Sequence, residues 1–354
     1  MKKQVKIIII AAIVSTAIWS CTKIDSSNLS LKQSVDVGAT NLNTAMDAIA
    51  SSKAYSILTV NDGTIKSTDA TATDYKVYIT LDTVKGVFNY KPILKRDRWN
   101  WSLMRFFEKT TDDTKMIVKM PLAKVERPRL LRIFLPSDTL LTNNFQIAVS
   151  DYHNNYNNYH DFDYLLKSEI SIDDKVAGQL NIDYLKNPVT GTKYASQYAF
   201  TDSYTADYKY ESGDTIVSSF GISGGGNLLY EEKRLTIKND TLRFGREHQY
   251  ILTIGDVMIV RSLGLATAKV YLNDVLQENA VVEVVDNDDN DTEGSVCKKR
   301  DVKITFDDGT STTIQTLIGT SVADIKTLFD SLHDVYFAAY VVDWIAYDIY
   351  YKRF

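Results

Sequence analysis

Apolar and polar side chains alternate with a period of two along most of the chain, between the Asn61–Thr64 turn and about residue 285. Successive side chains of a β-strand point to opposite faces, so this pattern predicts strands with one buried face. The alternation recurs in short runs that each share one parity: Tyr75, Val77, Ile79 and Leu81; Phe145, Ile147 and Val149; Tyr164, Leu166, Ile170 and Ile172; Tyr204, Ala206, Tyr208 and Tyr210; and Tyr250, Leu252 and Ile254.

Turn-forming residues separate these runs and indicate short connections. They are Asp173–Asp174, Glu211–Asp214, Gly224–Asn227, Lys238–Asp240 and Asn273–Asp274. Short turns join antiparallel strands, whereas a parallel sheet needs crossover helices, and the pattern contains none. The predicted fold is therefore mainly β within the α+β class, an antiparallel β-sandwich or open barrel spanning residues 40–285.

A helix is expected before this β-rich region. Thr40 or Asn41 can cap it, and the following apolar residues have helical spacing. These residues are Leu42, Ala45, Met46 and Ile49. We expect the helix to end near residues 51–53, before an extended run over Tyr55–Val60 and a hairpin at Asn61–Thr64.

The segment 286–297 divides the chain. It begins Asp286-Asn287-Asp288-Asp289-Asn290-Asp291-Thr292-Glu293 and carries no apolar side chain over these positions. Such a composition cannot bury a core, which predicts a solvated linker. Two EF-hand frames fall within it, starting at Asp286 or Asp289. Each lacks the Glu expected at position twelve, so no EF-hand is predicted, and weak binding of calcium to the acidic surface stays open.

Residues 298–354 have a pattern of their own. A strand is predicted over Val302–Phe306, a turn over Asp307–Thr310 and a return strand over Thr312–Leu317. A helix capped by Ser321 follows, and two extended runs over Val335–Val341 and Trp344–Tyr350 end the chain. This order resembles the β-grasp arrangement of ubiquitin-like domains, and the "TFDDGT … GTSV" stretch is similar to the β-grasp repeats of bacterial surface proteins.

The amino-terminal residues have the layout of a secretory signal: a cationic start, an apolar run from Ile7 to Trp19, then Ser20 and Cys21. Ile18-Trp19-Ser20-Cys21 resembles the lipobox of bacterial lipoproteins, although Trp19 is bulkier than usual. The resemblance implies cleavage of residues 1–20 and a diacylglycerol on Cys21, followed by a tether over residues 21–39. As a whole the chain resembles envelope lipoproteins of Bacteroidota, which implies an outer membrane location facing the periplasm or the outside.

Charge and cysteine content narrow the class of partner. Removal of residues 1–20, with three lysines and no acid, takes the formal charge from −5 to −8. An acidic protein is not expected to bind nucleic acid. With Cys21 lipidated, Cys297 is the remaining thiol, so no internal disulfide is possible. The lipid on Cys21 is therefore the expected membrane contact, and no cofactor is expected.

The sequence contains one weak match to a catalytic motif. Gly221-Ile222-Ser223-Gly224-Gly225 matches the G-x-S-x-G nucleophile elbow, which requires a turn from a strand into a helix. Here the pattern after the motif predicts another strand. We therefore expect a glycine-rich hairpin loop and name no catalytic residue.

The segment Asp151–Tyr164 is rich in Tyr, Asn and His. His153, His160, Asp161 and Asp163 could be drawn as metal ligands, but the spacing between the histidines is not typical of zinc sites, and no metal site is predicted. Tyrosine rings can stack on sugar rings while amides bind hydroxyls. The candidate ligand-binding residues are Tyr152, Tyr156, Tyr159 and His160, against the alternative of a polar connection with tyrosines packed on the sheet edge.

Three functions remain open. The favoured hypothesis is a non-enzymatic binding or scaffolding module whose ligand is a glycan, a peptide or a partner protein. The alternatives are a hydrolase of an envelope or extracellular polymer, with paired carboxylates in a cleft, and a lipid or lipoprotein carrier with a large apolar cavity. A concave strip lined by tyrosines would favour glycan binding.

Overall fold

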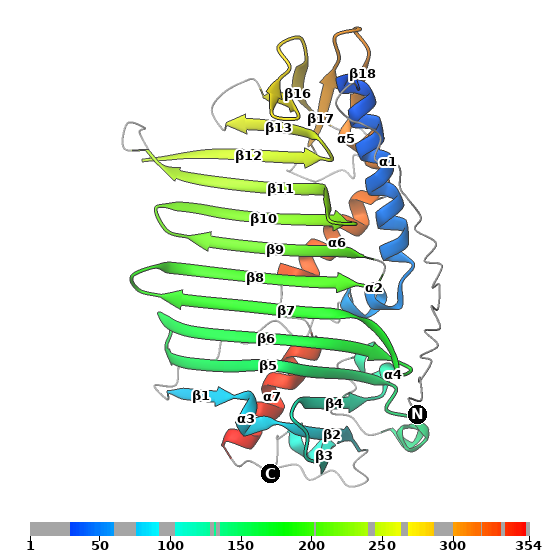
Figure 1. The fold of residues 1–354 in the computed structure, drawn as a ribbon, viewed down its shortest axis with the longest axis vertical. Helices are drawn as coiled ribbons and strands as arrows, with labels where there is room; N and C mark the ends of the chain where they lie inside the picture. Colours follow the sequence, from blue (N-terminus) through cyan, green and yellow to red (C-terminus); the bar gives the residue numbers. More distant parts are fainter. Residues whose placement is uncertain are drawn as a thin grey trace, which may run out of the picture.

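The computed structural model describes residues 29–59, 76–91, 103–127, 131, 135–201, 203–239, 245–262, 268–286, 300–319, 321–333 and 337–351. These residues form a mainly β protein built on one large, almost wholly antiparallel open sheet (Figure 1). The strand order is β15-β14-β13-β12-β11-β10-β9-β8-β7-β6-β5-β4-β2-β3, with β1 paired to β5 beside this path. From β5 to β15 each strand pairs with the next in sequence, so the sheet is a long meander.

The strands of the large sheet are β1 Val77–Thr80, β2 Gly86–Tyr90, β3 Phe107–Thr111, β4 Met116–Met120, β5 Phe145–Asn158, β6 Asp161–Ile172, β7 Lys175–Asn187, β8 Gly191–Phe200, β9 Tyr204–Ser212, β10 Thr215–Gly224, β11 Asn227–Lys238, β12 Arg246–Ile254, β13 Val257–Ser262, β14 Lys269–Leu272 and β15 Val275–Leu276. A small sheet contains β16 Val281–Asp286, β17 Arg300–Thr305 and β18 Ser311–Thr313. The helices are α1 Leu31–Ala50, α2 Lys53–Leu58, α3 Leu81–Val84, α4 Leu122–Val125, α5 Ile314–Ile318, α6 Ser321–His333 and α7 Phe337–Tyr350, with 3₁₀ turns η2 Leu103–Phe106 and η4 Pro136–Leu140.

The period-two pattern produces this sheet as predicted. In β5 the side chains of Phe145, Ile147 and Val149 are wholly buried on one face of the sheet. The predicted turns Asp173–Asp174 and Asn273–Asp274 adopt positive φ, the conformation of two-residue hairpins. Gly225 and Gly226 do the same between β10 and β11, so the G-x-S-x-G motif lies on a strand and a hairpin turn.

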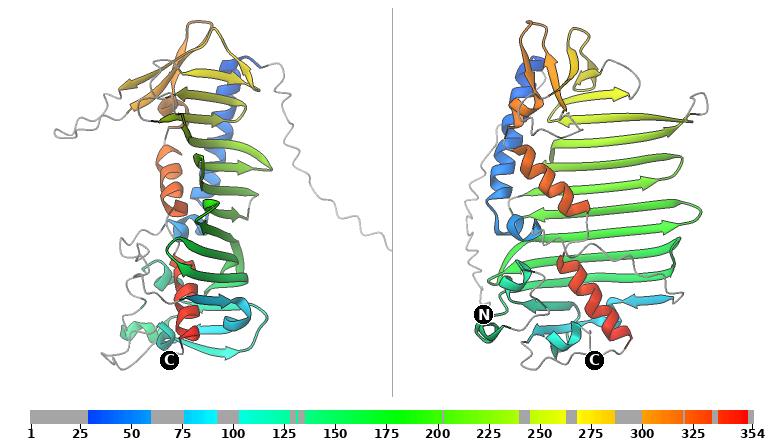
Figure 2. Two further views of the ribbon diagram at one scale, coloured as in Figure 1. Left: turned by 90° about the vertical axis from the view of Figure 1, so that its left-hand side faces the viewer. Right: turned by 180° about the vertical axis from the view of Figure 1, so that it is seen from behind.

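Helices cover one face of the large sheet. Helices α6 and α7 lie across this face, hereafter the helix face, while the opposite face carries no helix over its strands in the part of the chain that is described (Figures 1 and 2). Helix α1 runs along one end of the strands and contacts β11, β12 and β13. None of the described helices is both long and apolar enough to cross a membrane.

Helix α1 is held against the sheet by its apolar side and by a close approach of backbone. Ser30 caps the helix and forms a capping box with Gln33. A side chain at Gly38 would lie 3.0 Å from the carbonyl oxygen of Ile254, so glycine permits this contact. Leu42, with no exposed surface, belongs to the core that the helix and sheet share.

The amino-terminal predictions need two corrections. The sequence pattern predicts a helix start at Thr40 or Asn41, but α1 begins at Leu31, within the predicted tether, because Ser30 supplies an earlier cap. The predicted extended run over Tyr55–Val60 is wrong over its described part. Residues 53–58 form α2, capped by Ser52, which buries Ala54, Ile57 and Leu58 at helical spacing.

The carboxy-terminal part contains the predicted strand, the turn at Asp307–Thr310 and the helix from Ser321. The return strand is shorter than predicted, since β18 ends at Thr313 and α5 follows. The two extended runs over residues 335–341 and 344–350 are wrong over their described part: Phe337–Tyr350 is one helix, in place of the strands that a β-grasp order would add. Its β-branched and aromatic residues favour strands locally, but burial on the sheet selects the helix.

Most of the predicted linker, residues 287–297, and the lipobox with Cys21 lie outside the described residues. Strand β16, immediately before this segment, pairs with β17 after it, so the small sheet joins both sides of the segment.

Candidate functional site

One row of cross-strand neighbours on the helix face combines tyrosines with two arginines. Strand register places directly opposite one another, from β6 to β13, the residues Tyr164, Tyr184, Tyr194, Tyr210, Ser218, Arg234, Tyr250 and Arg261. We call these eight residues the tyrosine–arginine row. Adjacent strands lie about 4.8 Å apart, so the row crosses the sheet as a regularly spaced line of side chains.

Helix α7 covers the β6 end of the row. Tyr164 is 6% exposed and donates its hydroxyl to Oδ2 of Asp343 at 3.3 Å. Tyr152 in the neighbouring row donates to Oδ1 of the same carboxylate at 3.0 Å. Desolvation raises the pKa of Asp343 to about 7, although hydrogen bonds from both tyrosines lower it. These contacts fix α7 on the sheet, and they leave Tyr164 almost no contact with solvent.

Helix α6 reaches the middle of the row. The hydroxyls of Tyr194 and Ser196 both donate to the carbonyl of Leu332, at 3.2 and 2.6 Å. These bonds satisfy a carbonyl in the last turn of α6, where helical partners are missing. Phe329 on the same helix packs edge-on against Tyr208 and Phe220, so the central strands are covered here.

Beyond α6, towards the hairpins that join β9 to β10 and β11 to β12, no described helix crosses the helix face (Figure 2). The row continues there with Tyr210, Arg234, Tyr250 and Arg261. Arg234 is exposed and the other three are partly exposed. An open line of rings and guanidinium groups therefore remains on this half of the sheet.

The rings of the row are held in place by their neighbours. Tyr184 contacts Tyr194 edge-on at 5.7 Å between ring centroids and Phe162 at 5.1 Å. Burial raises the pKa of Tyr184 and, more strongly, that of Tyr250. Both therefore carry neutral hydroxyls at physiological pH. Fixed, neutral rings of this kind present flat apolar surface with one polar edge.

A carboxylate orients the ring of Tyr250. Glu232, the helix-face residue beside Arg234 on β11, accepts a hydrogen bond from Tyr230. A hydrogen bond to Glu232 also contributes to the raised pKa of Tyr250. Glu232 thus forms hydrogen bonds with two phenolic hydroxyls. Among the described residues, it forms no ion pair with either arginine of the row.

The structure separates the four predicted ligand-binding residues. Tyr152 is 2% exposed beneath α7, and Tyr156 is half-buried against Phe162 at 6.0 Å. Tyr159 and His160 are exposed at the turn between β5 and β6 and contact each other edge-on at 5.2 Å. The ammonium of Lys186 lies 3.4 Å from the centre of the Tyr159 ring, a cation–π contact. Of the four, the two at this turn are the ones that a large ligand could touch.

The four residues considered as metal ligands do not come together in the structure. His153 contacts Asp163 at 2.9 Å across β5 and β6, whereas His160 lies at the turn, so the four residues considered as metal ligands do not form one group. Within the described ranges no three His, Cys, Asp or Glu side chains gather as a metal site would require.

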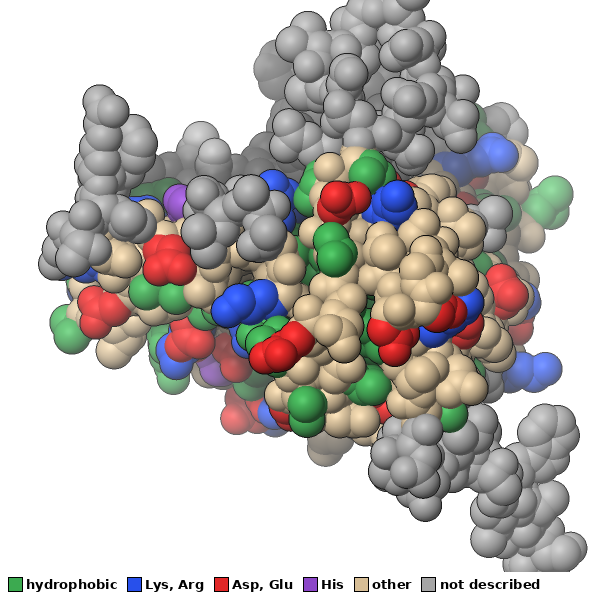
Figure 3. All heavy atoms as spheres, turned by 90° about the horizontal axis from the view of Figure 1, so that it is seen from above, with side chains coloured by type: hydrophobic (Ala, Val, Ile, Leu, Met, Phe, Trp, Pro, Cys, Tyr) green, Lys and Arg blue, Asp and Glu red, His purple; other side chains and the backbone are tan. Residues whose placement is uncertain are grey.

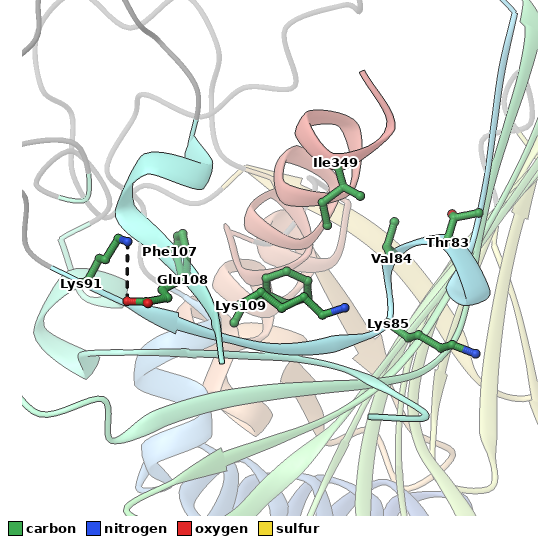
Figure 4. A pocket seen from close by; sticks show the side chains of 9 residues that line it. Thr83, Val84, Lys85, Lys91, Phe107, Glu108, Lys109 and Ile349 are labelled. Carbon is green, nitrogen blue, oxygen red and sulfur yellow. Dashed lines mark ion pairs between the residues drawn. The ribbon is translucent and has the colours of Figure 1, made fainter. Parts of the chain in front are cut away.

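A separate pocket of about 420 Å³ lies between α3, the β2–β3 pair and α7 (Figure 4). Its lining includes Phe88 and Phe107, which are 1% and 2% exposed and so offer little surface. Its basic side chains are paired with acids: Lys85 with Asp82, Lys91 with Glu108 and Lys109 with Asp112. These pairs compete with any bound anion, and we place no ligand there.

The end of the molecule that carries the small sheet has a mixed surface. Seen from above, acidic and basic side chains are interspersed over the part that is coloured (Figure 3).

Sequence reasoning identifies the tyrosines of the row only as strand residues of one parity. It misses the arginines, because the register of β11, β12 and β13 is needed to align positions 234 and 261 with Tyr250. The available signal is a basic residue on the same parity as the apolar core residues of its strand.

Comparisons with known proteins add no identification: no family model, no curated protein and no solved structure matches the chain.

Proposed function

We propose that this protein is a non-enzymatic, membrane-anchored binding module of the cell envelope, and that its ligand is an extended glycan. The observation that carries the proposal is the open half of the tyrosine–arginine row, where Tyr210 and Tyr250 are partly exposed on a rigid sheet. Rings fixed by the sheet lose little conformational entropy on binding, which favours them as contact residues.

The row suits a chain-like ligand. Its side chains repeat at about 4.8 Å across the strands, so a polymer lying along the row meets one side chain after another. Aromatic faces can stack on the C–H surfaces of sugar rings. Ser218, between Tyr210 and Arg234 in register, and the two guanidinium groups can hydrogen-bond hydroxyls.

Membrane attachment through Cys21 is the second part of the proposal. The lipobox resemblance supports it, and acyl chains would supply the anchoring energy. Replacement Cys21→Ser should leave the protein in the aqueous fraction after cell lysis, whereas the wild type should partition into detergent. If both chains fractionate alike, the anchor is refuted without affecting the proposed ligand.

The binding proposal is tested with residues 22–354 on an array of glycans and peptides, followed by titration calorimetry with a bound oligosaccharide. Tyr210→Ala and Tyr250→Ala should each weaken glycan binding at least about fivefold, as expected for truncation of a contact residue worth more than about 1 kcal/mol. Tyr78→Ala is the control, since Tyr78 is 65% exposed on β1 and outside the row. Absence of any glycan binding, or equal losses in all three variants, would refute the proposal.

A further inference from the structure

The two arginines of the row face the same stretch of sheet. Arg234 lies on β11 and Arg261 on β13, directly opposite Tyr250 on either side. Neither guanidinium has an ion pair or hydrogen bond to another residue within the described part of the chain. The lysines that line the pocket near α7, by contrast, each have an acidic partner.

Arg234 is exposed and Arg261 is partly exposed, so a ligand on this half of the sheet can reach both residues. Arginine presents planar donors that match carboxylate, sulfate and phosphate oxygens in bidentate geometry. The position of both groups on one row therefore favours an anionic ligand at this end of the sheet.

The distance between Arg234 and Arg261 indicates how the acidic groups of a ligand would be spaced. Two strand intervals separate β11 from β13, which places the arginine attachment points about 9–10 Å apart. Tyr250 lies between them, partly exposed, with its hydroxyl engaged by Glu232. The pattern of cation, ring and cation matches a polymer whose acidic groups occur on alternate units, with an uncharged ring between them.

We propose that the ligand is an acidic polysaccharide, bearing carboxylate or sulfate groups on alternate sugars, and that Arg234 and Arg261 are its specificity-determining residues. This inference rests on the proposed glycan-binding function. Glu232, a neighbouring carboxylate on the helix face, opposes anion binding, and its hydrogen bonds with the hydroxyls of Tyr230 and Tyr250 do not remove its charge. His248, in the next row towards the hairpin ends, shares a hydrogen bond with Thr236.

The test uses residues 22–354 and four probes of equal length: a hyaluronan oligosaccharide with a carboxylate on every second sugar, an oligogalacturonate with one on every sugar, an uncharged galacto-oligosaccharide and poly-glutamate. We expect an acidic sugar to bind at least about tenfold more tightly than the uncharged one, the value of one charge-assisted interaction of about 1.5 kcal/mol. Arg234→Gln and Arg261→Gln should each remove most of this preference while binding to the uncharged sugar stays within about twofold. The affinity of the acidic sugar should also fall with added salt.

Lys233→Gln is the matched control. Lys233 precedes Arg234 on the same strand, so its side chain points to the opposite face and carries the same charge. An equal loss in Lys233→Gln would show a general charge effect and overturn the assignment of the arginines. Equal affinity for acidic and uncharged sugars, unchanged in both arginine variants, would overturn the inference but leave the proposed function. Tighter binding of poly-glutamate than of any sugar would overturn both.

Discussion

Tyr152 and Asp343, which lie 191 residues apart in sequence, are joined by a hydrogen bond of 3.0 Å between the phenolic hydroxyl and Oδ1. Tyr164 reaches the other carboxylate oxygen of Asp343. The same kind of bond recurs between Tyr55 of α2 and Asp324 of α6, at 2.6 Å. Tyrosine–carboxylate bonds therefore join elements that are distant in sequence, which accounts for several of the 22 tyrosines without invoking a ligand.

The environment of Asp343 predicts how stability depends on pH. Its pKa in the folded protein is about 7, raised by desolvation from 3.8. The folded state thus holds the proton more tightly than the unfolded state. Asp343 therefore makes its full contribution to the free energy of unfolding below about pH 4. This contribution is lost as the pH rises to about 7, above which the free energy of unfolding no longer changes because of this group.

Asp343→Asn should remove that decline, because the amide stays neutral and can still accept a hydrogen bond from a tyrosine. Since Asp343 keeps some accessible surface, we expect the variant to be about 1–2 kcal/mol more stable than wild type at about pH 8. Urea unfolding at about pH 4.5 and about pH 8, roughly either side of the transition, measures the difference. Asp330→Asn, at an exposed site on α6, should preserve the wild-type pH dependence.

The buried pair of Lys124 and Asp138 makes a second prediction. Their side chains are each 2% exposed and lie 2.7 Å apart, and Asp138 also accepts a bond from the backbone of Leu135. Lys124→Met leaves a carboxylate buried without its cation, which should destabilise the protein by about 3–5 kcal/mol. The double variant Lys124→Met/Asp138→Asn should cost less than the sum of the single changes.

Chemical unfolding of the four proteins in a double-mutant cycle measures the coupling between Lys124 and Asp138. Lys85→Met is the control, because its pair with Asp82 is exposed and should contribute less than about 1 kcal/mol. Additive single and double changes at positions 124 and 138 would contradict the predicted coupling.

The meander could be predicted from the sequence because each strand carries its own alternation and each turn its own signal. Asp173 and Asp174, for example, favour a two-residue hairpin locally. Helix α7 is mispredicted because Val341, Val342 and Ile345 favour strands, and only packing against β5 and β6 decides otherwise. The candidate site could not be predicted because it depends on register across eight strands, which no local pattern encodes.

Gly178 provides a third prediction. A side chain there would lie 2.5 Å from both the carbonyl oxygen of Ala199 and a ring carbon of Tyr198 on the paired strand β8. Gly178→Ala should therefore force the two strands apart and cost about 1–3 kcal/mol. Gly213→Ala is the matched control, since open space surrounds Gly213 in the turn before β10 and its backbone conformation suits other residues. Equal thermal unfolding temperatures for the two variants would contradict the steric argument.

Phe329 tests whether α6 is held to the sheet by aromatic contacts. Its ring lies 5.6 Å from that of Tyr208 and 5.7 Å from that of Phe220, edge-on in both cases. Phe329→Ala should destabilise the protein by about 2–3 kcal/mol, less than a wholly buried phenylalanine would, because the side chain is only partly buried. Amide hydrogen exchange should speed up in α6 before it does in β5 to β7, since the variant weakens the packing of α6 on the sheet and leaves the strand ladders intact.

The control for Phe329→Ala is Lys326→Ala, on the exposed side of the same helix, which should leave the exchange of α6 unchanged. The two hydroxyl bonds to the carbonyl of Leu332 persist in both variants, so they hold the end of α6 equally in each. A difference between the variants therefore reports the aromatic contacts of Phe329. Uniform acceleration across the sheet would instead show that α6 and the meander unfold as one unit.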